Sequence, residues 1–209
     1  MKKKLIIFDM DGTLIDSGDV ITNTINFVRT NIGLNKIDKL EMLTNLNNPD
    51  INSAEFFYGT SEFTDEQTQL FTEYYDNNCT KDIKLYKGIK EMLKLISKDF
   101  ILAVATNASV DFATKMIKHL EIFQYFDIIV GATCVERPKP NPDMLLYILD
   151  KLDIKKEHSI LIGDSLKDQK AAESADIDSL LVNWGFSEHC DNIAVNNTKD
   201  LTKRILELK

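Results

Sequence analysis

Hydrophobic positions along the chain follow two patterns in turn. Short continuous apolar runs, typical of strands buried on both faces of a sheet, occur at residues 5–8, 101–105, 128–130, 160–162 and 180–182. Apolar residues with the spacing of one helix face occupy residues 89–96, 112–120 and 145–152. Alternating strands and helices predict an α/β fold, a doubly wound parallel sheet of the Rossmann-like kind.

Residues 15–84 interrupt this alternation. Residues 21–32 show helical spacing, and Thr64 with Gln67 predicts a capping box at the start of another helix. No repeats and no Pro/Gly-rich linker occur in the chain. We therefore expect a core domain of residues 1–14 and 85–209, with a small helical cap domain of residues 15–84 inserted after the first strand.

Composition and charge exclude several classes of protein. The 209 residues are 44% hydrophobic and 28% charged, which is ordinary for a globular protein. The net charge is −8, and residues 15–84 hold 5 Lys/Arg against 12 Asp/Glu, a net −7. A nucleic-acid partner is not expected, because such proteins carry a basic stripe. No apolar stretch approaches the roughly 20 residues of a membrane span, so no membrane partner is expected.

The apolar run at residues 5–8 is too short for a secretory signal, and the three cysteines lack metal-ligand spacing. These observations favour a cytoplasmic protein. We expect a monomer or a weak homodimer that acts on a small molecule. The aromatic pairs Phe56–Phe57 and Tyr74–Tyr75 are interpreted as core rather than as a substrate platform.

Polar residues that can carry chemistry follow the predicted strands. Asp9 and Asp11 come after the first apolar run in FDMDGT, and the pair 106–107 (Thr-Asn) ends the second. Asp164 and Asp168 follow another run in GDSLKD. Because ligands bind at the carboxyl edge of open α/β sheets, these separate segments are predicted to meet in one site.

Four carboxylates at one edge need a counter-charge. Two like charges 4 Å apart repel by about 4 kcal/mol at an effective dielectric constant of 20. A set of oxygen ligands without neighbouring His or Cys favours a hard cation, and Mg²⁺ is bound through one or two carboxylates together with substrate phosphate. The sequence therefore predicts Mg²⁺ as cofactor.

Four segments in order resemble the motifs of the haloacid dehalogenase superfamily: DMDGT at 9–13, Thr-Asn at 106–107, Lys139 in RPKPNPD, and GDSLKD at 163–168. The resemblance covers the whole core. The helical insert between the first two motifs resembles the C1-type cap of the phosphoglycolate phosphatase and beta-phosphoglucomutase-like branch. The resemblance implies a Mg²⁺-dependent phosphatase that hydrolyses a small phosphate monoester, either phosphoglycolate-like or a sugar phosphate.

The resemblance also implies a role for each residue. Asp9 would be the nucleophile that forms an aspartyl-phosphate, Asp11 the acid and base, and Lys139 the group that neutralises developing charge. The implied substrate-binding residues are Thr106, Asn107 and Gly12. The implied metal ligands are Asp9, Asp11 (through its backbone carbonyl), Asp164 and Asp168.

Other functions use related residues. A phosphomutase of the beta-phosphoglucomutase type would retain every motif and is the main alternative. A dehalogenase needs neither Asp11 as acid nor Mg²⁺, so the full acidic set disfavours it. A phospho-receiver protein, which is not an enzyme, places its acidic pair and its phosphorylated Asp after different strands and has no cap. Because the cap has no basic cluster, we expect a small monophosphate with a neutral or weakly anionic leaving group.

Overall fold

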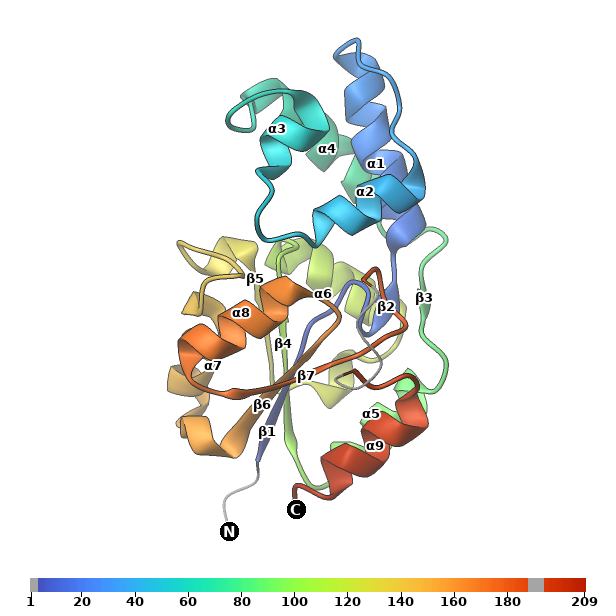
Figure 1. The fold of residues 1–209 in the computed structure, drawn as a ribbon. Helices are drawn as coiled ribbons and strands as arrows, with labels where there is room; N and C mark the ends of the chain where they lie inside the picture. The colour runs from blue at the N-terminus through green and yellow to red at the C-terminus, as the bar shows by residue number, and fades with distance from the viewer. Residues whose placement is uncertain (1–3, 188–193) are drawn as a thin grey trace.

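The computed structural model describes residues 4–187 and 194–209. Its main sheet is parallel throughout and runs in the order β5-β4-β1-β6-β7 (Figure 1). The five strands are β1 (Leu5–Phe8), β4 (Ile101–Thr106), β5 (Ile128–Gly131), β6 (Ser159–Gly163) and β7 (Asp178–Leu181). Strands β4 and β5 lie on one side of β1 and β6 and β7 on the other, and such a switch point in strand order opens a crevice at the carboxyl ends of the strands.

Successive side chains of a strand point to opposite faces of the sheet, so these continuous apolar strands make both faces apolar, and helices cover both. Ile6 and Phe8 of β1 belong to one buried cluster, and Leu5 and Ile7 belong to the other. The covering helices are α5 (Ile89–Ile96), α6 (Val110–His119) and α9 (Thr198–Leu206) on the first face, and α7 (Asp143–Leu152) and α8 (Leu166–Ala175) on the second.

Residues 15–84, the segment expected to form the cap, stand beyond the carboxyl edge of the sheet, opposite the two termini (Figure 1). The helices of this segment are α1 (Gly18–Asn31), α2 (Lys39–Leu46), α3 (Ser53–Tyr58) and α4 (Asp65–Asn78). Two short antiparallel strands, β2 (Ile15–Asp16) and β3 (Lys84–Leu85), pair where the chain leaves and re-enters the core. The two chain segments that connect the core to the cap therefore lie side by side.

The expected α/β fold is confirmed. The capping box at Thr64 and Gln67 is present in α4, but α2, α3 and α9 were not predicted. The side chains of Asp38 and Asn52 cap α2 and α3, so the local signals for these short helices lie in the sequence. None of the helices in the described residues is both long and apolar enough to cross a membrane.

Candidate active site

Asp9 lies directly after β1, at the centre of the carboxyl edge. Its backbone N–H donates to the carbonyl of Ile162 at the end of β6, at 2.8 Å. The chain then turns sharply at Gly12, which has φ +83°. A Cβ atom at Gly12 would lie 2.3 Å from Oδ2 of Asp164, so only glycine fits this approach. The turn brings Asp9, Asp11 and Asp164 together.

Lys139 provides the positive charge at the centre of the site. Its Nζ lies 2.5 Å from Oδ1 of Asp9 and 2.6 Å from Oδ1 of Asp168, and its side chain is only 3% exposed. Burial alone would lower the pKa of Lys139, but the carboxylates of Asp168 and Asp9 raise it above its usual range. The lysine therefore stays charged between two acidic groups.

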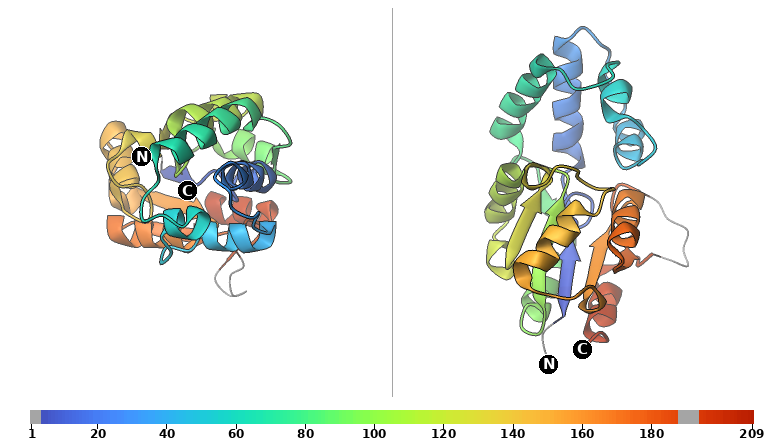
Figure 2. Two further views of the ribbon diagram at one scale, coloured as in Figure 1. Left: turned by 90° about the horizontal axis from the view of Figure 1, so that it is seen from above. Right: turned by 90° about the vertical axis from the view of Figure 1, so that its left-hand side faces the viewer.

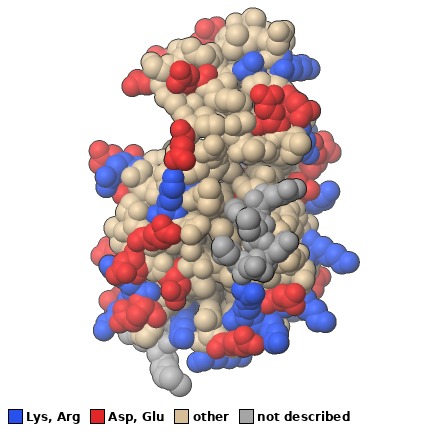
Figure 3. All heavy atoms as spheres, viewed as in Figure 1, with Lys and Arg blue, Asp and Glu red and all other residues tan. Residues whose placement is uncertain are grey.

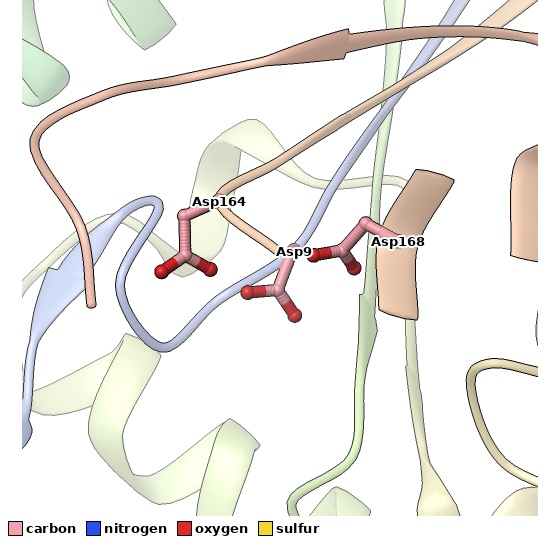
Figure 4. A group of neighbouring side chains, drawn as sticks. All are labelled: Asp9, Asp164 and Asp168. Atoms are coloured by element: carbon pink, nitrogen blue, oxygen red, sulfur yellow. The ribbon is translucent and has the colours of Figure 1, made fainter. Parts of the chain in front are cut away.

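Asp168 and Asp164 are buried and held by different partners. Asp168 is the third residue of α8, where its Oδ2 accepts hydrogen bonds from the backbone N–H and hydroxyl of Ser165 in a capping box. Oδ2 of Asp164 accepts from the backbone N–H of Phe186 at 2.7 Å. Figure 4 shows Asp9, at the end of β1, converging with Asp164 and Asp168 from the segment that runs from β6 into α8.

Burial raises the pKa values of these acids. The pKa of Asp9 is raised to about 7, mainly by desolvation, although Lys139 opposes this shift. The pKa of Asp164 is raised by burial and by the charges of Asp9 and Asp168. Burial also raises the pKa of Asp11, while hydrogen bonds from Ser17 and Thr106 lower it. These acids therefore hold protons at higher pH than exposed carboxyls do.

Thr106 and Asn107 lie at the end of β4 beside these acids. Oγ1 of Thr106 accepts a hydrogen bond from the backbone N–H of Ala108. The amide of Asn107 donates to the backbone carbonyl of Lys139 at 2.7 Å, so it positions the lysine loop. Helix α6 begins at Val110 and is capped by the side chain of Ser109, so Thr106 and Asn107 lie just before its N-terminus.

The donor set fits a hard divalent cation. Carboxylate oxygens of Asp9, Asp164 and Asp168 all lie within 4.8 Å of one another, and all three residues are buried. Together with Asp11 they place four carboxyl groups around one ammonium group, that of Lys139. A divalent cation would offset the excess negative charge. Oxygen donors alone are the kind of ligand set that Mg²⁺ prefers.

Two segments that the sequence did not predict complete the site. From the cap, the amide of Asn47 donates to Oδ2 of Asp164 at 3.1 Å, across 117 residues of chain. Lys167 of α8 donates to the carbonyl of Leu46 at 2.7 Å. The loop after β7 contributes Gly185 and Phe186. Apart from the glycine at position 185, the local sequence holds no signal for these contacts, because they depend on the tertiary fold.

Gly185 is predicted to be essential for the position of Asp164. A Cβ atom there would lie 2.3 Å from the carbonyl of Gly12 and 2.4 Å from Oδ2 of Asp164. We expect Gly185→Ala to lower kcat by about 10²-fold, because a shift of about 1 Å in a catalytic group can cost that much. Gly33→Ala is the control, since Gly33 has φ +79° but no atom nearby. It should lose stability and keep kcat, whereas equal kcat in both variants would contradict the prediction.

The raised pKa of Asp9 predicts how stability depends on pH. Between its ordinary value of 3.8 and about 7, the folded protein binds more protons at Asp9 than the unfolded chain does. The free energy of unfolding of the metal-free protein should therefore fall as pH rises from about 4 to 7. The free energy of unfolding, measured with urea at several pH values in this range, should depend less steeply on pH for Asp9→Asn than for the unchanged protein. Parallel slopes for the two proteins would contradict the prediction.

The fold and the site together define a class: an α/β protein with a buried acidic site at the carboxyl edge of its sheet, a lysine inside it and a helical cap above it. The model of the family described as haloacid dehalogenase-like hydrolase matches residues 6–182. The chain belongs to this family.

Individual relatives match along nearly the whole chain. A protein named phosphoglycolate phosphatase from Nitrosococcus oceani is 26% identical and covers 99% of this chain and 95% of its own length. A solved structure described as a predicted phosphatase from Clostridium acetobutylicum has a TM-score of 0.86 at 26% identity, covering 99% and 100% of the two chains. A haloacid dehalogenase-like hydrolase from Streptococcus pneumoniae has a TM-score of 0.81 at 27% identity, covering 97% and 98%.

Proposed function

We propose that this protein is a Mg²⁺-dependent phosphatase that hydrolyses a small-molecule phosphate monoester through an aspartyl-phosphate on Asp9. The observation that carries this proposal is the ammonium group of Lys139 between Asp9 and Asp168, with Asp11 and Asp164 beside it. Phosphoryl transfer depends mainly on such positioning and charge compensation. The names of the relatives support phosphatase activity.

In the first step, a carboxylate oxygen of Asp9 attacks phosphorus and the bond from phosphorus to the leaving oxygen breaks. Asp11 donates its proton to that oxygen, which leaves as an alcohol. Burial favours the protonated form of Asp11 that this step needs. Lys139 offsets the charge that develops on the phosphoryl oxygens.

In the second step, water attacks phosphorus and gives its proton to Asp11. The bond from phosphorus to Asp9 breaks, which restores the carboxylate and releases inorganic phosphate. Thr106, Asn107 and the turn at Gly12 position the phosphoryl group in this proposal. Splitting one displacement into two lowers the barrier of each.

Asp9, Asp164 and the backbone carbonyl of Asp11 would hold Mg²⁺, with Asp168 supporting the set. When bound, Mg²⁺ supplies positive charge beside the phosphoryl oxygens. In this proposal, residues 15–84 act as a cap domain over the site. The cytoplasmic location and the state of a monomer or weak homodimer stay predictions.

The test is release of inorganic phosphate from a panel of small monophosphates with Mg²⁺ and with EDTA. We expect EDTA to lower the rate by at least about 10²-fold and added Mg²⁺ to restore it, because the metal lowers the barrier by several kcal/mol. Free phosphate as the readout separates hydrolysis from transfer to a sugar hydroxyl. Full activity in EDTA, or transfer without free phosphate, would contradict the proposal.

A further inference from the structure

A large cavity extends from Asp9 and Lys139 into the space beneath the cap. Its volume is about 620 Å³, and α1, α3, α4 and α6 contribute to its walls. Pockets of roughly 300–1,000 Å³ hold ligands of drug size. A leaving group of two carbons would therefore fill only a small part of it.

Aromatic rings line the cavity from α3 and the segment after it. Phe57 and Tyr58 are buried beside it, and Phe63 packs edge-on against Tyr58 with 5.8 Å between ring centroids. The interpretation of Phe57 as core alone is therefore incomplete, because the ring also faces the space above the acidic site. One wall of the cavity is an aromatic surface.

A second aromatic group lines the cavity from α4 and α6. Phe71 stacks on Tyr75 with 5.3 Å between ring centroids, and Phe112 meets Tyr75 edge-on at 5.0 Å. The interpretation of Tyr75 as core alone is incomplete in the same way. Helices α3 and α4 stand apart in both views of Figure 2, so the two aromatic groups approach the cavity from different helices.

The cap contributes no ionisable acid, lysine, arginine or histidine to the cavity wall among the described residues. On the face of the molecule drawn in Figure 3, Lys and Arg side chains lie mainly over the sheet-containing core and are few over the cap. The two lysines of the wall come from the core. Lys139 binds Asp9 and Asp168, and Lys167 donates to the Leu46 carbonyl. A negative charge on the leaving group would lose water without gaining a cation from the cap.

We propose that the natural substrate is a phosphate monoester of an uncharged alcohol that carries a flat aromatic or heteroaromatic ring. The phosphate lies at Asp9 and the ring lies between the aromatic groups of α3 and of α4 with α6. Stacked and edge-on ring contacts add to the gain from burying apolar area. This inference rests on the proposed function and defines the substrate class of the same site.

Four esters test the substrate class: benzyl phosphate, cyclohexylmethyl phosphate, ethyl phosphate and phosphoglycolate. We expect kcat/KM for benzyl phosphate to exceed that for ethyl phosphate by at least about tenfold, with cyclohexylmethyl phosphate between them. Phosphoglycolate should be at least about tenfold poorer than benzyl phosphate, because burying its carboxylate costs hydration. A nucleoside 5′-monophosphate extends the series to a heteroaromatic ring.

Phe71→Leu tests the wall directly, because it removes a ring and keeps an apolar side chain. We expect it to lower kcat/KM for benzyl phosphate about tenfold and to leave ethyl phosphate within twofold. Phe27→Leu is the matched control, since Phe27 is a partly buried aromatic residue of the cap that stacks on Tyr74, outside the cavity. It should leave both substrates unchanged. Equal effects of Phe71→Leu on both esters would contradict the role of the ring.

Thr68→Arg tests the charge of the wall. Thr68 is an exposed residue of α4 that lines the cavity, so arginine can replace it without loss of packing. The new cation should raise kcat/KM for phosphoglycolate about tenfold. Gln69→Arg, the matched control, makes the same charge change on the next exposed residue, outside the cavity. An equal gain in both variants would point to general charge and contradict the inference.

The outcomes separate the two proposals. If phosphoglycolate is the best ester, or ethyl phosphate equals benzyl phosphate, the proposed substrate class is overturned and the phosphatase activity stands. If Mg²⁺ supports release from none of the esters, the proposed function is overturned and this inference with it.

Discussion

Replacing Asp9 with asparagine is expected to lower kcat by at least about 10⁴-fold, the largest effect of any single substitution. The amide has the shape of the carboxylate but is a poor nucleophile, so no covalent intermediate can form. Its carbonyl oxygen can still accept from Lys139, which keeps its ion pair with Asp168. Phosphate release with the best ester of the panel measures the loss.

Stability separates this loss from unfolding. Asp9→Asn removes one of several crowded buried carboxylates, so the free energy of unfolding of the metal-free protein should stay the same or rise. Asp150→Asn, on the exposed end of α7, is the matched control and should change neither activity nor stability. Activity of Asp9→Asn within tenfold of the unchanged protein would show that another group is the nucleophile.

Replacing Lys139 with methionine is expected to have the second largest effect, and it should affect both activity and stability. Methionine has a similar length and no charge, so developing charge on the phosphoryl group loses its buried cation. We expect kcat to fall by about 10²- to 10³-fold, as for the loss of one oriented electrostatic group. Steady-state phosphate release measures this fall.

The same substitution leaves Asp9 and Asp168 facing each other without the ammonium group between them. Removing one partner of a buried ion pair typically costs about 3–5 kcal/mol, so the melting temperature of the metal-free protein should fall. Added Mg²⁺ should recover part of the loss. Lys94→Met, at an exposed position of α5, is the control. A Lys139→Met variant as stable and active as this control would contradict the account.

Much of the core could be predicted from local sequence. Strand β1 followed by Asp9 and Asp11 has a continuous apolar run, and its central, buried position requires such a run. The capping box of Thr64 and Gln67 was equally readable, because its hydrogen bonds join residues three apart. The expected meeting of Asp9, Asp11 and Asp164 rested on one rule, that carboxyl ends of parallel strands share an edge. The place of Lys139 beside them rested on the family resemblance alone.

The rest depends on contacts between distant segments. No local pattern shows that Asn47 of the cap reaches Asp164, because that contact depends on how the cap docks on α8. The contact between the Asn107 amide and the Lys139 carbonyl was missed for the same reason. The aromatic cavity was missed because Phe57 and Tyr75 satisfy the spacing of core residues and also line the site.

The central claim is a covalent phosphoryl group on Asp9, and its direct detection is the most direct test. The protein would be mixed with Mg²⁺ and excess substrate, quenched in acid within milliseconds, and reduced with borohydride, which converts an aspartyl-phosphate to homoserine. Peptide mass spectrometry should then find homoserine at position 9, dependent on substrate and absent from Asp9→Asn. Turnover at the full rate with no modification at position 9, or with modification at another carboxylate, would contradict the account.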